Sequence, residues 1–297
     1  MDLRNKIEKL MIESSIGLTK VSSHLKYRFI QPVSPLVSII IVTFNNIGYT
    51  RFCISSIYTK TFQPGFELII VDNASTDGTK EYLYTLKRKY RNVNIIINDK
   101  NLGFAAANNI GIKEAKGKYI IFLNNDTIVT RGWMSGLIKY LRKSDVGIVG
   151  PVTNAIGNEA KIDVSYKDLI MELTSENLME MELFAKHYTI KKRGFFFEIP
   201  MLALYCAAMR RDVIDKIGLL DERFSVGMFE DDDYSMRIKK AGFKVICAED
   251  VFIHHFGGTS FSKLHPDEYY KIFEENRKKY ELKWGIEWTP HKQRNQE

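Results

Sequence analysis

Cysteine is scarce in this sequence, which has only three among 297 residues, namely Cys53, Cys206 and Cys247. Their number is odd and their surroundings are apolar, so we expect reduced core residues rather than a disulfide framework or a zinc site. Long apolar runs are also absent, since no stretch reaches the roughly 18 residues that a membrane-spanning helix needs. The opening stretch MDLRNKIEKL is charged and lacks the apolar centre of a signal peptide. These absences predict a cytoplasmic protein.

Several signatures of nucleotide and nucleic-acid binding are missing as well. There is no G-x-G-x-x-G and no G-x-x-x-x-G-K-[ST], so neither a dinucleotide-binding fold nor a P-loop is supported. The net charge of +7 favours anionic partners. Without an RNP, zinc-finger or helix-turn-helix pattern, however, we expect no nucleic acid. A diphosphate ligand or an anionic membrane surface explains the charge equally well.

Composition divides the chain into three parts. Residues 1–34 place apolar side chains at helical spacing among charged ones, and we expect an amphipathic helical extension. Such a helix packs on its own domain, pairs with a second copy of the chain in a homodimer, or makes a peripheral membrane contact. Residues 35–262 form the predicted main domain, with an insertion at about 152–198 where no period is clear. Residues 263–297 predict a charged helical tail.

Strands and helices alternate through the first half of the main domain. The expected strands are 37–43, 67–71, 93–97 and 119–123, and the expected helices are 50–60, one from about 77, and 104–115. Each strand is a short apolar run, typical of strands buried on both faces of a sheet. The alternation predicts an α/β fold with parallel strands and right-handed crossovers. Further strands are expected at 146–149, 200–209, 243–247 and 251–253.

Polar residues lie at the carboxyl ends of three of these strands. Thr43 ends the first strand, Asp72 follows the second, and Asp126 follows the fourth. Ligands of open α/β sheets bind at such strand ends, and a carboxylate there can hold a hard metal ion beside an anionic ligand. Asp126 also has another interpretation, because aspartate is a favoured helix cap and a helix is expected to begin near Thr130.

Four consecutive acids occupy Glu230 to Asp233, just before a predicted helix at 234–241. Acidic residues favour a helix N-terminus, which accounts for two of the four. Crowded carboxylates repel one another unless a cation or a raised pKa relieves them. A functional role for this cluster is therefore the better interpretation.

Two histidines, His254 and His255, end the last predicted strand and precede Gly257 and Gly258. A histidine pair on a protein surface usually has no special role. At a strand's carboxyl end, a neutral imidazole could complete a metal site with Asp126.

Taken in order, these motifs resemble those of the family 2 glycosyltransferases, which are inverting enzymes with the GT-A fold. The motifs are Val42-Thr43-Phe44-Asn45, Val71-Asp72-Asn-Ala-Ser-Thr-Asp77-Gly, Asn101-Leu-Gly103-Phe, Leu123-Asn-Asn-Asp126, Arg211…Gly218…Asp221-Glu-Arg-Phe224, Glu230-Asp231-x-Asp233 and His254-His255-x-Gly-Gly. Each is weak alone, but their order and spacing between residues 35 and 262 are specific. The resemblance implies a Rossmann-like, mostly parallel central sheet flanked by helices, with the insertion on the acceptor side. The Leu-Asn-Asn-Asp-Thr turn is similar to that of rhamnosyltransferase-like bacterial and archaeal members.

The resemblance implies a nucleoside diphosphate-sugar donor and a divalent metal ion. The residues expected to bind the donor are Thr43, Asn45, Asp72, Asn101, Gly103, Asn108, Asn125 and Asp126. Among them, Asp72 is expected to accept the N–H of a pyrimidine ring. Asp126 is expected to hold Mn²⁺ or Mg²⁺ on the diphosphate, with His254 as the first further ligand and His255 as the second choice.

The same resemblance assigns the chemistry and exposes two departures. Asp231 is expected to be the general base, in a motif that it shares with Glu230. Asn124 stands where the family's DxD motif has its first acid, so metal binding would rest mainly on Asp126. Asn108 stands where many members have an arginine near the donor, so that contact is weakened or lost.

The implied reaction moves a sugar from a UDP- or dTDP-linked donor to an acceptor hydroxyl in surface polysaccharide or glycoconjugate biosynthesis. The acceptor would be a glycan or a lipid-linked glycan, and the place the cytoplasm or the inner membrane face. A nucleotidyltransferase acting on sugar phosphates is one alternative, although Phe44-Asn45-Asn46 offers no basic glycine-rich loop. A non-catalytic nucleotide-sugar-binding scaffold is another, although a scaffold has no need of four crowded acids.

Overall fold

The structure is a computed structural model that describes residues 35–61, 65–167, 169, 173–257 and 265–294. The expected N-terminal extension and its membrane or homodimer contacts lie outside the described residues. The strands are β1 (Val37–Thr43), β2 (Phe66–Asp72), β3 (Val93–Ile97), β4 (Tyr119–Leu123), β5 (Thr127–Val129), β6 (Val146–Val152), β7 (Phe196–Glu198), β8 (Cys206–Arg210) and β9 (Lys244–His255). The helices are α3 (Ile47–Lys60), α4 (Thr79–Lys89), α5 (Phe104–Glu114), α6 (Trp133–Tyr140), α7 (Ser175–Lys191), α8 (Arg211–Ile217), the 3-10 helix η1 (Glu222–Phe224), α9 (Glu230–Lys240) and α10 (Pro266–Trp284).

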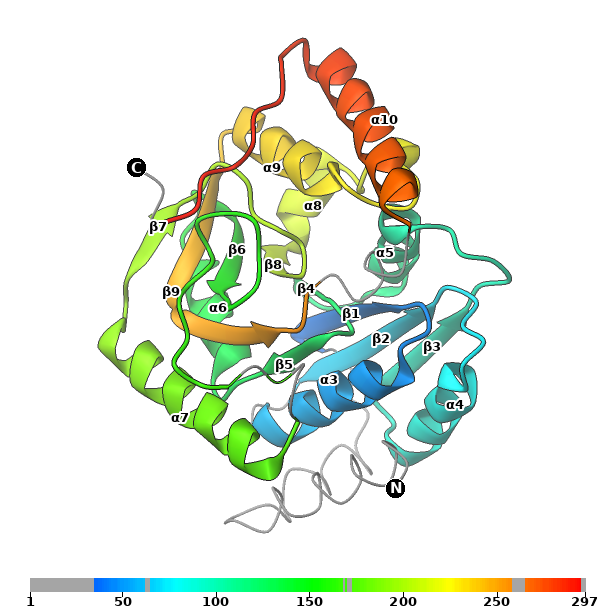
Figure 1. Cartoon of the computed structure of the whole chain (residues 1–297), viewed down its shortest axis with the longest axis vertical. Helices are drawn as coiled ribbons and strands as arrows, with labels where there is room; N and C mark the ends of the chain where they lie inside the picture. The colour runs from blue at the N-terminus through cyan, green and yellow to red at the C-terminus, as the bar shows by residue number, and fades with distance from the viewer. Residues whose placement is uncertain (1–34, 62–64, 168, 170–172, 258–264, 295–297) are drawn as a thin grey trace.

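A mixed, largely parallel sheet forms the centre of the molecule (Figure 1). Its strand order is β3-β2-β1-β4-β8-β6-β9-β5, with β7 also paired to β9. Strands β1 to β4 are mutually parallel, and β6 is parallel to β9, whereas β8 runs antiparallel between β4 and β6. The predicted α/β class with a mostly parallel central sheet is confirmed. Parallel strand ends therefore meet on one edge of the sheet.

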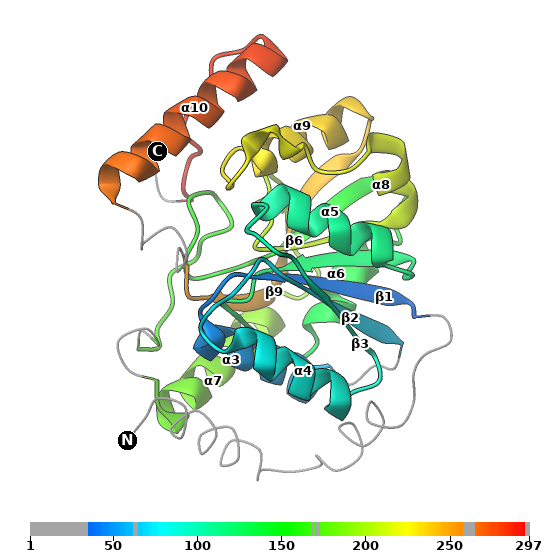
Figure 2. The same ribbon diagram turned by 90° about the vertical axis from the view of Figure 1, so that its right-hand side faces the viewer.

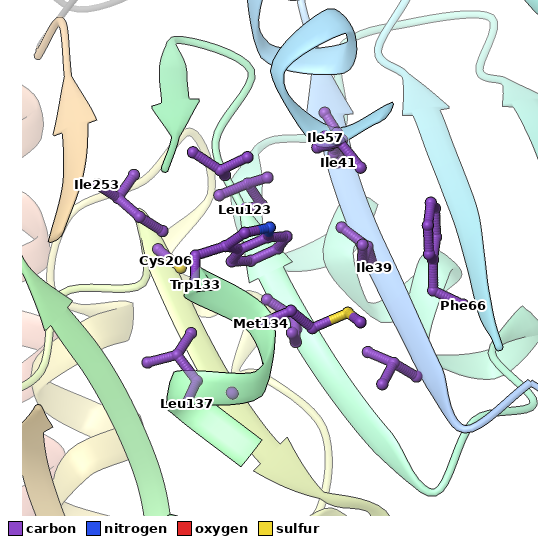
Figure 3. Packing of buried hydrophobic residues seen from close by; sticks show 14 of the residues in the cluster. Ile39, Ile41, Ile57, Phe66, Leu123, Trp133, Met134, Leu137, Cys206 and Ile253 are labelled. Carbon is purple, nitrogen blue, oxygen red and sulfur yellow. The ribbon is translucent and has the colours of Figure 1, made fainter. Parts of the chain in front are cut away.

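Helices cover both faces of the sheet, as Figure 2 shows. On one face, α3, α4 and α6 contribute to a continuous apolar cluster, and on the other face α5, α8 and α9 do so. Figure 3 shows Trp133 of α6 beside Leu123 of β4 and Cys206 of β8, and Ile41 of β1 beside Ile57 of α3, all of them buried. Each β1 side chain from Ile39 to Ile41 is buried, which explains the continuous apolar run in the sequence.

The structure corrects the capping interpretation of Asp126. The residues that follow it form the short strand β5, and α6 begins at Trp133 with Gly132 as its N-cap. Because β5 pairs antiparallel with the end of β9, Asp126 is placed at a strand junction instead of a helix start. Its side chain is therefore not explained by capping.

Other elements differ in length from those expected. The strands predicted at 243–247 and 251–253 are one continuous strand, β9, since it pairs with β6, β7 and β5 in turn. The strand expected at 200–209 is limited to β8. The stretch 152–198 contains the long helix α7 and the strand β7, so it is more regular than its sequence suggests. The helix expected in the tail is confirmed as α10.

Candidate active site

The carboxyl ends of β1 and β2 are joined by side-chain hydrogen bonds. Thr43 and Asp72 are direct partners in the pairing of the two strands, and Thr43 Oγ1 donates to Asp72 Oδ1 over 2.9 Å. The other carboxylate oxygen of Asp72 accepts from Ser75 N over 3.0 Å, and Thr43 and Asp72 are fully buried. A buried carboxylate that accepts two hydrogen bonds is fixed in orientation. Its remaining lone pairs are then suited to accept a hydrogen bond from an N–H or O–H group of a ligand.

Asn45 connects the loop after β1 to the loop after β2. Its Oδ1 accepts from Thr76 N over 2.8 Å, and its backbone N donates to Ser75 Oγ over 2.7 Å. Its φ of 57° lies in the left-handed region, which asparagine tolerates better than most residues. The structure thus brings Thr43, Asn45 and Asp72 to one edge of the sheet.

Gly103 allows two backbone segments to approach closely. Its φ of 85° and ψ of 174° form a combination that essentially only glycine adopts. A Cβ at this position would overlap with Ser225 O. Asn101 Oδ1 accepts from Gly103 N over 2.9 Å, and Asn73 Nδ2 donates to Gly103 O over 3.2 Å. The loop before α5 is therefore held against the turn that precedes α9.

Two other predicted donor-binding residues have partners within the fold. Asn108 is 2% exposed, and its Nδ2 donates to Phe104 O of the same helix over 2.9 Å. Asn125 Nδ2 donates to Thr50 Oγ1 of α3 over 2.9 Å. One amide N–H of each residue thus donates within the fold. Contact of either residue with a nucleotide-sugar donor stays a prediction.

Asp126 lies against His255. Asp126 Oδ1 is 3.3 Å from His255 Nε2, and both side chains are buried. Phe256 N donates to Asp126 O over 2.9 Å, which holds the start of β5 against the end of β9. His255 Nδ1 is 2.9 Å from Ala155 O, and its ring stacks on that of Tyr205 with centroids 4.8 Å apart. Burial alone would lower the pKa of His255, but the hydrogen bond and charge of Asp126 outweigh it and raise that pKa.

His254 has different surroundings. Its Nδ1 is 2.7 Å from Tyr166 OH, and its ring meets the ring of Phe256 edge-on, with centroids 4.7 Å apart. Burial and the neighbouring charge of His255 lower the pKa of His254 to about 3, so the imidazole is neutral. Its Nε2 is buried without a hydrogen-bond partner among the described residues. The structure favours His255, the second choice from the sequence, as the partner of Asp126.

The Asp126–His255 pair fits a divalent cation in part. A carboxylate oxygen and an imidazole nitrogen are both ligands that manganese accepts. Their separation of 3.3 Å is close to that of neighbouring ligands on an ion with bonds of roughly 2.1 Å. Across the described part of the chain, however, no three histidine, cysteine or acidic side chains form a ready metal centre. An ion here would need further ligands from a bound anion such as a diphosphate.

The four acids at the start of α9 divide into two pairs. Asp232 and Asp233 are bound by donors from α10, from the segment after it and from α9 itself. These donors are Trp288 Nε1 at 3.0 Å and His291 Nε2 at 2.8 Å from Asp232, and Lys283 Nζ at 2.5 Å, Trp284 Nε1 at 3.0 Å and Arg237 Nε at 3.0 Å from Asp233. These two acids are therefore accounted for by contacts within the fold.

Glu230 and Asp231 have no ion-pair partner among the described residues. Glu230 is buried, and its Oε2 has no hydrogen-bond partner in that part of the chain. Burial raises the pKa of both carboxyl groups, and the charge of Asp232 raises both further. A carboxylate with a raised pKa is a stronger base than an ordinary one, so this pair is suited to proton transfer.

One short segment, Leu204–Tyr205, lies between the acids of α9 and the Asp126–His255 pair. The backbone N–H of Leu204 lies near enough to the Asp231 carboxyl group to lower its pKa in part, and the next residue, Tyr205, carries the ring that stacks on His255. Asn124 N also donates to Tyr205 O over 2.7 Å, which places the end of β4 beside the same segment. Asp231 and His255 are therefore linked through neighbouring residues of one segment.

Sequence reasoning did not identify every residue of this site. Tyr166 and Tyr205, which contact His254 and His255, come from stretches where no motif was seen. The tail donors to the acids were also missed. A signal existed, because two of the three tryptophans lie four residues apart in an otherwise charged tail.

The chain's motifs also have counterparts in known proteins. A family model described as "Glycosyl transferase family 2" matches residues 38–218, which is more than half of the chain. The chain belongs to glycosyl transferase family 2. The matched range contains Thr43, Asp72 and Asp126, but α9 and α10 lie beyond it.

Relatives of this family 2 chain span a range of lengths. The uncharacterized protein y4gI of Sinorhizobium fredii is 26% identical over 255 residues, covering 81% of this chain and 26% of that protein. Glycosyltransferase AglE of Haloferax volcanii is 26% identical over 223 residues, covering 74% of this chain and 67% of AglE. The chain thus spans about a quarter of the length of one relative and two thirds of the other.

A solved structure supports the fold of this family 2 member. The chain is similar to GalNAc-T7, crystallised with UDP, GalNAc and Mn²⁺, with a TM-score of 0.58 and 19% identity. The likeness covers 75% of this chain and 44% of GalNAc-T7.

Proposed function

We propose that this family 2 member is an inverting, metal-dependent glycosyltransferase. It transfers a sugar from a UDP- or dTDP-linked donor to a hydroxyl group of a glycan or lipid-linked glycan, in surface polysaccharide or glycoconjugate biosynthesis. The observation that carries the proposal is the segment Leu204–Tyr205, which contacts Asp231 through one residue and His255 through the next. This segment supports a site that combines a base with a metal ion.

The binding half of the site is built from the strand ends. Asp72, fixed by Thr43 and Ser75, is suited to accept the N–H of a pyrimidine ring. Asp126 and His255 would hold Mn²⁺ or Mg²⁺, which would neutralise charge on the diphosphate leaving group. GalNAc-T7, which the chain resembles in fold, was crystallised with UDP and Mn²⁺ together, and this supports a nucleotide and a metal ion as joint ligands here.

The chemical half of the site lies at the start of α9. The acceptor oxygen forms a bond to the anomeric carbon from the face opposite the diphosphate, and the bond between that carbon and the diphosphate oxygen breaks. Asp231 takes the proton of the acceptor hydroxyl, which its raised pKa favours. Only one base is needed, and no covalent intermediate forms, so the configuration at the anomeric carbon inverts.

The proposal is tested by incubating the purified chain with UDP- and dTDP-sugars, Mn²⁺ and a panel of sugar acceptors. Nucleoside diphosphate should be released in an acceptor-dependent way, and the anomeric proton coupling of the product should show inversion. Pyrophosphate as the product would instead indicate a nucleotidyltransferase. Donor binding by calorimetry without turnover on any acceptor would indicate a scaffold.

The cellular setting is a finer proposal. Among the described residues, none of the helices has the length and apolar character needed to cross a bilayer. We place the reaction in the cytoplasm, at the inner membrane face when the acceptor is lipid-linked. Fractionation of cells should then recover the protein with the cytosol or the inner membrane, and recovery outside the cell would contradict this placement.

A further inference from the structure

The turn that leads into α9 has an unusual backbone. Ser225, Met228 and Phe229 have φ values of 48°, 77° and 73°, and Gly227 between them has a φ of 148°. Side chains rarely tolerate such values, and runs of them persist only where the surroundings hold the backbone in place. Phe229 is the N-cap of α9 and immediately precedes Glu230 and Asp231. The position of the proposed base thus depends on this turn.

Asn276, in the middle of α10, holds the turn. It is 1% exposed, and its Nδ2 donates to Phe224 O and to Gly227 O, each over 2.8 Å. Both N–H groups of a side-chain amide are thereby used. Asparagine is a weak helix former, so the helix itself gains nothing from this residue. Its contacts with the turn account for its presence there.

A second set of contacts holds the first turn of α9 from the same side. Trp288 Nε1 donates to Asp232 Oδ1 over 3.0 Å, and Trp284 Nε1 donates to Asp233 Oδ1 over 3.0 Å. The ring of Trp288 also meets that of Phe229 edge-on, with centroids 5.3 Å apart. Figure 1 shows α10 and the segment after it beside α9.

We propose that Asn276 is a positioning residue, which together with Trp288 clamps the turn 225–229 so that the Asp231 carboxylate faces the acceptor hydroxyl. We expect the clamp to act mainly on the base. Asn276 and Trp288 contact η1, the turn, the first turn of α9 and neighbours in their own C-terminal segment, whereas the turn meets the loop before α5 through Ser225 and Val226. This inference rests on the proposed function. The clamp lies beyond the range that the family model matches, so family membership does not assign it.

The test compares Asn276→Ala with Arg277→Ala in steady-state kinetics. Asn276→Ala removes both donors to the turn, whereas Arg277 pairs, in the described part of the chain, with Glu274 and Glu281 of its own helix. A misplacement of about 1 Å at a reacting group can cost roughly 100-fold in rate. We therefore expect kcat to fall between about 10-fold and 100-fold in Asn276→Ala. Donor KM and UDP affinity should stay within about twofold, and Arg277→Ala should behave as the wild type.

A second variant keeps the test decisive if Asn276→Ala does not fold. Trp288→Phe retains an aromatic ring but removes the Nε1 donor to Asp232. It should also lower kcat at unchanged donor KM, and it should shift the acid limb of the pH profile, because Asp232 influences the pKa of Asp231. If both folded variants keep wild-type kcat, or if kcat and UDP affinity fall together, the clamp is wrong. Absence of transfer by the wild-type chain would contradict the proposed function instead.

Discussion

The two adjacent histidines show that the sequence of a strand does not reveal which side of the strand each residue faces. His254 and His255 are consecutive in β9, so their side chains point to opposite sides of the strand. A one-residue shift in register would exchange their environments, and no local pattern in the sequence fixes that register. The pairing of Thr127 with His255 decides it, because it places His255 beside Asp126.

Substitution of each histidine should therefore have a different effect on metal binding. We expect UDP with Mn²⁺ to raise the melting temperature of the wild-type chain by mass action. His255→Ala should lose most of the Mn²⁺-dependent part of this increase, because it removes the nitrogen beside Asp126. His254→Ala should keep it, since His254 Nδ1 contacts Tyr166 instead. A thermal-shift titration in which only His254→Ala lost the effect would contradict this assignment.

The raised pKa of Asp231 predicts the pH dependence of activity. A general base must be ionised, so kcat/KM should fall as the pH decreases through its pKa, which lies above the ordinary aspartate value of about 3.9. The charge of Asp232 contributes to that shift. Asp232→Asn should therefore move the acid limb to lower pH, whereas Asp215→Asn on the exposed face of α8 should leave it in place.

The outcome that would count against this interpretation is an acid limb of Asp232→Asn that stays where it is or moves to higher pH.

The stability of the fold should depend on the same carboxyl groups, but it should fall as the pH rises, whereas activity should increase. A carboxyl group with a raised pKa in the folded state favours folding while it is protonated, and this contribution is lost as the pH rises through the folded-state pKa.

Among the connecting elements, the loop between β3 and α5 makes the most specific demand on its sequence. Gly103 combines a positive φ with a backbone neighbour, Ser225 O, in the space that a Cβ would occupy. Gly132 has a similar φ of 82°, but no atom lies within 4 Å of the position that its Cβ would take. Substitution of either glycine by alanine would introduce backbone strain, but of the two only Gly103→Ala would also introduce steric overlap.

We expect Gly132→Ala to lower the free energy of unfolding by about 1–2 kcal/mol, the usual cost of a left-handed conformation for a residue with a Cβ. Gly103→Ala should lower it further, because Ser225 must also move. Urea denaturation of both variants measures the difference. Equal values for the two would show that the close approach at Gly103 does not constrain the fold.

Elements with a complete local pattern were predictable from the sequence, and elements defined by their partners were not. The run Val37–Thr43 is apolar throughout most of its length, so β1 was recognisable as a buried parallel strand. The direction of β8 and the unbroken length of β9 depend on which strands lie beside them. The three residues of β5 are too few to show a period.

In the molecule as a whole, the candidate site draws on segments that are far apart in the chain. Thr43 and Asp72 come from the first parallel strands, His255 from the last strand, and the donors to Asp232 from the C-terminal segment. The motifs at the strand ends could be assigned to one region from the sequence alone, because the carboxyl ends of parallel strands meet at one edge of a sheet. The roles of Tyr166, Tyr205 and the tail were not, since they arise only when distant segments pack together.

The central claim is that Asp231 is the base of a sugar transfer. The most direct measurement is the kcat of Asp231→Asn, assayed as nucleoside diphosphate release with Mn²⁺, the preferred donor and its acceptor. We expect a loss of about 10²–10⁴-fold, the usual worth of general-base catalysis, with UDP affinity unchanged. Asp215→Asn, the matched change of an exposed acid, should retain full activity. An Asp231→Asn variant that keeps wild-type kcat would contradict the account.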